Sequence, residues 1–193
     1  MWLIALLAAV AAPAFCGEYS LQLTPANTRI EWTLPDILHS VHGTFELKRG
    51  SIRFDPDSGK AAGEVVVDAA SGDSGSAARD RRMHKEILES GRYLEAVFAP
   101  DKIEGRLPEG DSEADIHGEL RIHGAAHEVT LHVTIHRKGD DISASARFLI
   151  PYVKWGMKNP STFILRVSSQ VEVEVRLAGR LTRAPLASRT YRD

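Results

Sequence analysis

Apolar and polar residues alternate through most of the chain after residue 18, and this period of two constrains the fold more than any other feature. The segment 128–136 is the clearest case, because valine, leucine, valine and isoleucine occupy its odd positions from 129 to 135, while threonine and histidine occupy the even ones. Successive side chains of a β-strand point to opposite faces of the sheet, so each segment would bury one face and expose the other. The chain is therefore predicted to be an all-β protein of antiparallel strands.

Turn-forming residues separate the alternating segments, as in the sequence DPDSGK at 55–60 and the His123-Gly124 pair. Eight or more antiparallel strands with short connections are typical of a closed barrel or a sandwich. A barrel of about eight strands leaves room for side chains or for one small ligand. Several positions expected to face inward are small or medium in size, which favours a cavity although sandwiches use them too: Gly43, Val65, Val67, Ala96, Ala144 and Ala146.

Residues 79–98 begin with the one clear break in the strand pattern. Met83 and Ile87 are four residues apart, and so are His84 and Leu88, which gives an apolar stripe with one imidazole at helical spacing. Ser76 or Asp80 is a suitable N-cap, and a glycine at position 91 ends the pattern. We predict one short α-helix near residues 77–89, which would close a barrel end or cover a cavity.

Charge and length exclude several classes of partner. The formal net charge of the 193 residues is −2 and the isoelectric point is near 6.4, so no basic excess indicates a nucleic-acid partner. No polybasic run indicates an anionic membrane surface, and no apolar segment has the length of a transmembrane helix. The locally basic residues 183–193 are expected to form a flexible C-terminal tail.

The N-terminus is predicted to be a signal peptide covering residues 1–16. A short apolar run from residue 2 to 14 ends in small residues, with cleavage expected after Ala14 or Cys16. The mature protein would then be exported, to the periplasm or the extracellular space. Cys16 is the only cysteine, so it cannot form an internal disulfide. It would be removed with the signal or remain an idle thiol, and a lipid-modified cysteine stays an alternative.

Four short motifs in order resemble one known family. They are HSVHGTF at 39–45, the Arg79-Asp80 pair followed by the helix and YLEAVF, GELRIHG at 118–124, and EVTLHV at 128–133. Together they resemble the YceI-like family of extended, lipocalin-like barrels described as polyisoprenoid-binding. The chain departs from the family pattern at Leu94, where proline is usual, and at Ala96, where a β-branched residue is common.

The resemblance implies a single antiparallel lipocalin-like β-barrel domain over residues 17–182. It also implies a non-enzymatic protein whose lumen holds an isoprenoid lipid or quinone chain, with no other cofactor. Position and strand parity then predict an apolar lining, although each of these residues could equally be ordinary core: Trp32, Phe45, Phe54, Met83, Leu88, Phe98, Tyr152 and Trp155. Polar groups that could meet a ligand head are His39, Arg79, Asp80 and His84. For Arg79 and Asp80 we favour a structural role, by capping and ion pairing at the loop–helix junction.

Two other functions remain open from the sequence. Eight histidines raise a metal-binding or hydrolytic site, but no HExxH, CxxC or GxSxG motif is present, so neither a metal site nor catalysis is predicted. Alternatively, the barrel binds a protein partner without lipid, through a strand edge or residues 151–163. A homodimer is also left open.

Overall fold

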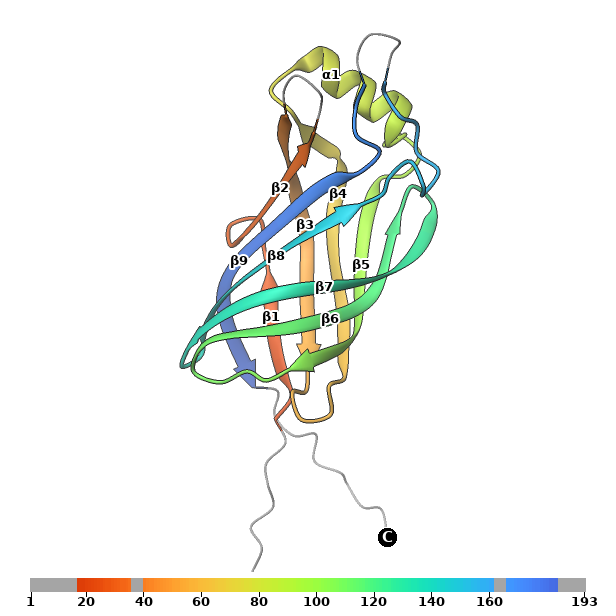
Figure 1. The fold of residues 1–193 in the computed structure, drawn as a ribbon. Helices are drawn as coiled ribbons and strands as arrows, with labels where there is room; N and C mark the ends of the chain where they lie inside the picture. Colours follow the sequence, from red (N-terminus) through yellow and green to blue (C-terminus); the bar gives the residue numbers. More distant parts are fainter. Residues whose placement is uncertain (1–16, 36–39, 162–165, 184–193) are drawn as a thin grey trace, which may run out of the picture.

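The computed structural model describes residues 17–35, 40–161 and 166–183. The predicted signal peptide, His39 and residues 184–193 of the predicted tail lie outside this part of the chain. Nine strands and one short helical insert make up the fold (Figure 1). The strands are β1 (Tyr19–Leu23), β2 (Thr28–Leu34), β3 (Val41–Phe54), β4 (Ala61–Asp73), β5 (Glu95–Gly105), β6 (Gly110–Ile122), β7 (Ala125–Lys138), β8 (Asp141–Ile150) and β9 (Val171–Arg183). The insert consists of α1 (Ala77–Arg82) and the π-helical η1 (Met83–Ile87).

The strands close into an antiparallel barrel, which confirms the predicted fold class. Each strand from β3 to β8 pairs with the next along the chain, and β2 joins β9 to β3. Strands β1 and β2 share one place in the ring. Strand β2 pairs with the first part of β3 from Val41 to Phe45, and β1 pairs with its last part from Gly50 to Phe54. Closure gives each member of the eight-membered ring a partner on both sides over at least part of its length, which limits the free edges that promote aggregation.

A bulge in β3 changes which residues point into the barrel. The register with β4 shifts between Leu47 and Arg49, so one extra residue lies opposite the neighbouring strand. Phe45 and Leu47 therefore face inward on odd positions, whereas Ile52 and Phe54 face inward on even ones. Without this extra residue, the last third of β3 would turn its apolar face to water.

Two local predictions have different outcomes. The hairpin at His123-Gly124 forms as expected, and both residues have positive φ angles of 51° and 78°. Around Pro100 the sequence predicts two separate strands, at 93–99 and 103–107, but one strand, β5, covers Glu95–Gly105. A register shift between Pro100 and Lys102 accommodates the proline, which lacks the N–H that a regular ladder requires.

The barrel wall parts between β7 and β8 at the end that carries the helices. The β7–β8 register stops at Val133 and Ala146, although β7 continues to Ala125 and β8 to Ile150. Residues 151–157, which we call the strap, follow β8 at this point and are visible beside the upper ends of β8 and β9 in Figure 1. In the described part of the chain, no helix has both the length and the apolar character needed to cross a membrane.

Candidate functional site

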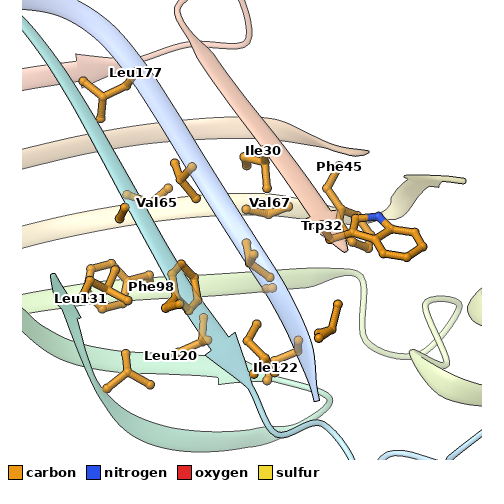
Figure 2. Close-up of a pocket in the computed structure, with 18 of the residues that line it drawn as sticks. Ile30, Trp32, Phe45, Val65, Val67, Phe98, Leu120, Ile122, Leu131 and Leu177 are labelled. Carbon is orange, nitrogen blue, oxygen red and sulfur yellow. The ribbon is translucent and has the colours of Figure 1, made fainter. Parts of the chain in front are cut away.

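A long apolar cavity of about 820 Å³ occupies the interior of the barrel. Inward-facing residues of all nine strands line it, together with residues of the helical insert and of the strap. Figure 2 shows Val65, Phe98, Leu120 and Leu131 among the apolar side chains directed into this space. The volume lies within the range of about 300–1,000 Å³ that is usual for small-molecule sites. The alternation of the sequence thus produces a hollow interior as well as a core.

The structure brings most of the sequence-predicted lining residues to this cavity. Seven of them line it: Trp32, Phe45, Phe54, Met83, Leu88, Phe98 and Tyr152. Trp155 and His84 do not, and His39 is outside the described residues. Whether any of them contacts a ligand stays a prediction.

Trp32 is placed by a glycine on the neighbouring strand. Gly43 is its cross-strand partner, and a Cβ atom at this position would lie 2.4 Å from the indole ring. The absence of a side chain therefore lets the indole lie flat against β3, with its ring centroid 6.5 Å from that of Phe45. The Trp32 side chain is buried, yet its indole N–H has no hydrogen-bond acceptor among the described residues.

The helical insert is fixed to β4 by close packing and by one histidine. Gly72 lies beneath Met83, and a Cβ atom on it would come within 2.6 Å of the Met83 methyl carbon. The His84 Nε2 atom donates a hydrogen bond to the Gly72 carbonyl at 2.9 Å, and the Ser90 hydroxyl donates to its Nδ1 atom at 3.2 Å. Both nitrogens of this ring are thus engaged within the protein, and His84 supports the insert from behind the cavity wall.

Arg79 and Asp80 both bind Ser74, in the turn before α1. The Arg79 guanidinium donates to the Ser74 hydroxyl at 2.8 Å and to its carbonyl at 2.9 Å. The Asp80 carboxylate accepts from the Ser74 hydroxyl and from its backbone N–H. These bonds, with that of the hydroxyl the largest cause, hold the pKa of Asp80 below its usual value of 3.8. Ser76 occupies the N-cap position without a side-chain capping bond, so the junction is held by bonds to Ser74 rather than by the predicted cap.

The strap is tied mainly to the segment before β9. The Tyr152 hydroxyl donates to the Ser168 carbonyl at 2.6 Å, and burial raises the pKa of Tyr152 to about 12. Trp155 stacks on His127 of β7 with ring centroids 4.0 Å apart and nearly parallel planes. This stack spans the place where β7 and β8 part, which explains why Trp155 lies on the wall rather than in the lumen.

Among the polar residues that line the cavity, Arg82 and His123 were not singled out from the sequence. Arg82 lies within the predicted helix, so its place beside the cavity follows from that helix. His123 was interpreted only as a turn residue. The buried His123 Nε2 atom lies 3.5 Å from a Glu89 carboxylate oxygen, without a hydrogen bond. His123 has a positive φ of 51°, which is uncommon for a residue other than glycine and is visible only in the structure.

The remaining histidines include three on the outer face of β6 and β7. His132 bonds Asp115 at 2.9 Å and His136 bonds Asp111 at 2.6 Å, while His117 bonds Thr130. Across the described ranges, no three histidine, cysteine, aspartate or glutamate side chains are grouped so that they could hold a metal ion.

Comparison with known proteins gives one consistent match. The model of the YceI-like domain matches residues 21–179. A UPF0312 protein of Vibrio vulnificus is 25% identical over 180 residues, covering 91% of this chain and 94% of that protein. Two solved structures share the fold at a TM-score of 0.65. One is BcnA of Burkholderia cenocepacia, 20% identical, with 78% of this chain and 95% of that chain covered. The other is described as a polyisoprenoid binding domain from Saccharophagus degradans implicated in plant cell wall breakdown, 19% identical, with 85% and 98% covered.

Proposed function

The chain belongs to the family of YceI-like domains, and on this basis we propose that it is an exported, non-enzymatic lipid-binding protein. Its ligand would be a polyisoprenoid, either a quinone or a prenyl lipid, whose chain lies in the barrel lumen. The observation that carries the proposal is the continuous apolar cavity, lined by strands on every side of the barrel. The polyisoprenoid-binding description of the Saccharophagus neighbour favours this class of ligand.

The size of the cavity suits a ligand of several isoprene units. If each non-hydrogen atom takes about the 30 Å³ share of a liquid water, the cavity of about 820 Å³ holds on the order of 27 such atoms. This corresponds to roughly five isoprene units of five carbons each. A ligand of this kind needs apolar surface along its whole length, and methionine and aromatic side chains such as Met83 and Phe98 adapt to its branched shape.

The head of the ligand is proposed to lie near the helical insert. The indole N–H of Trp32 is a buried donor without an acceptor in the described structure, and such groups are costly to leave unpaired. A quinone carbonyl or a prenol hydroxyl would supply an acceptor. His123 lines the cavity as well, and its Nε2 atom also lacks a hydrogen bond.

The side chains around the cavity support a binding role over catalysis. Within the described ranges, the one serine–histidine hydrogen bond joins Ser90 to His84, and neither residue lines the cavity. Catalysis by a histidine-activated serine requires such a pair beside the bound substrate. The proposal of export rests on the apolar N-terminal segment. Mass spectrometry of the N-terminal peptide of the secreted protein tests whether this segment is removed.

Gentle purification, organic extraction and mass spectrometry test the lipid proposal directly. A reproducible isoprenoid compound at a near-equimolar ratio is the expected result. A protein that arrives empty and also fails to take up added quinones and prenols would overturn the proposal.

A further inference from the structure

The end of the barrel that carries the helical insert holds positive charge without partners. Residues 77–94 and 151–160 together contain seven lysines and arginines but three acidic residues, a net charge of +4. The whole chain has a net charge of −2, so the rest carries −6. These two segments are far apart in the sequence, which is why no basic run is visible there.

Packing brings the two segments together on one end of the molecule. Ile87 and Leu88 of the insert pack against the same buried cluster as Tyr152 and Met157 of the strap. Figure 1 shows the helical insert and the turns that follow β8 at the same end of the barrel. We refer to residues 77–94 and 151–160 as the basic end.

The cations of the basic end are exposed and largely unpaired, while its acidic residues are engaged. Arg82 pairs with Glu86, Arg79 bonds Ser74 and Arg92 lies over the Tyr93 ring. The other four make no ion pair, side-chain hydrogen bond or ring contact within the described structure: Arg81, Lys85, Lys154 and Lys158. By contrast, Glu86 pairs with Arg82 at 3.4 Å and Asp80 is bound by Ser74. The accessible charge here is therefore positive.

Two exposed leucines mark the same end. Leu94 and Leu149 are 60% and 59% exposed and are the large apolar side chains that the described structure leaves open to solvent. Leu94 precedes β5, and Leu149 lies one residue before the end of β8, where these strands reach the basic end. The cavity also reaches this surface, because its lining includes the exposed Arg79 and Arg82 of α1.

We propose that the basic end docks on an anionic lipid bilayer. The unpaired cations would approach the lipid head groups, and Leu94 and Leu149 would enter the interface, which places the adjacent end of the cavity against the membrane. Cations near an anionic surface and a few inserted apolar side chains are the usual components of reversible membrane binding. The purpose of such docking, transfer of a lipid chain, rests on the proposed function. Binding to the bilayer itself can be measured whether or not the cavity holds a lipid.

Vesicle co-sedimentation tests the proposal, using phosphatidylcholine vesicles with and without phosphatidylglycerol. The protein should bind the anionic vesicles preferentially and release them at high salt. Arg81→Gln with Lys85→Gln should weaken binding about 30-fold, because each cation near an anionic surface contributes about fivefold. Replacing Leu94 and Leu149 by serine should reduce the part of the binding that salt does not remove.

A matched double variant at the opposite end provides the control. Arg53→Gln with Lys138→Gln removes the same charge from exposed positions near the far ends of β3 and β7 and should leave vesicle binding unchanged. All variants carry the same N-terminal segment, so differences report the substitutions alone. Equal binding to both kinds of vesicle, or equal losses in the two double variants, would overturn the proposal. Prenol binding is measured in parallel without vesicles. A protein that does not bind lipid in its cavity is thereby distinguished from one that does not dock on a bilayer.

Discussion

Filling the lumen from one wall should separate binding from stability. Ala144 lies in the middle of β8, lines the cavity and is paired with Leu177 of β9. In the Ala144→Trp variant the added indole takes at most about 270 Å³, if each of its nine ring atoms occupies a water-sized share. This is about a third of the cavity of about 820 Å³, so the barrel can accept the ring without displacing its walls.

The expected magnitudes differ for a hollow lumen and for a packed core. Loss of room for about nine ligand atoms, at about 0.3 kcal/mol each, costs about 2.7 kcal/mol, or about a hundredfold in affinity. An indole forced into a filled core costs about 1–3 kcal/mol of stability, which lowers Tm by roughly 2–12 °C in a protein of this size. With an empty lumen, Tm of the lipid-free protein should change by less than about 2 °C.

Fluorescence titration with a prenol and thermal unfolding of the delipidated protein measure the two quantities. Ala178→Trp is the matched control, because Ala178 is exposed on the outer face of β9 and should change neither. A loss of stability in Ala144→Trp as large as the loss of binding would refute the hollow lumen. Unchanged affinity would show that the ligand does not pass Ala144.

Three further predictions concern the insert and the outer face. Gly72→Ala should push the Met83 methyl group and the Phe45 ring away from β4, because its Cβ atom would lie 2.6 Å from each, and should speed ligand release, as measured by stopped-flow exchange. Asp80→Asn should abolish a pH-dependent part of stability. Because the pKa of Asp80 is lowered in the folded state, its stabilisation is present above the unfolded value of about 3.8 and is lost as pH falls through the folded value, which urea unfolding at several pH values detects. The Asp115 carboxylate raises the pKa of His132 above 6.5, so Asp115→Asn should move the His132 titration in NMR spectra down toward 6.5.

Each of these predictions has a clear contradicting result. Gly91→Ala is the control for the first, because a Cβ atom at this position meets nothing within 4 Å, and equal release rates in both glycine variants would contradict it. The prediction for Asp80 would be contradicted if acid lowered the free energy of unfolding of the wild-type protein no more steeply than that of Asp80→Asn. An unchanged His132 titration would contradict the third.

The lumen could be predicted from the sequence because alternation is a local property. Along β7, for example, parity alone places Val129 and Leu131 on the cavity side, and the structure agrees. The same rule fails beyond a bulge. In β3 the inward face changes from Leu47 to Ile52. The Arg49-Gly50 pair permits a bulge or bend in the sequence, but the exact place of the extra residue is set by pairing with β4.

The positions of two predicted site residues depend on contacts between distant parts of the chain, so the sequence alone could not predict them. His84 and Leu88 have helical spacing, so both were candidates for the cavity side. Only the carbonyl of Gly72, twelve residues earlier, directs His84 away from the cavity. Trp155 was likewise expected in the lumen, and the gap between β7 and β8 that positions it against His127 arises only when the barrel closes.

At the basic end, the helical insert and the strap are parts of the cavity wall that lie outside the strand ladders. Opening a strand ladder breaks many backbone hydrogen bonds at once. Moving the strap away from β7 instead breaks the stack of Trp155 on His127, which is the ring contact across the gap between β7 and β8. Both parts lie at the basic end and share one apolar cluster, so movement of either loosens the other. We therefore expect ligand exchange at this end. It is also the end where the unpaired cations and the exposed leucines lie, so the chain that leaves the cavity there would pass directly into a docked bilayer.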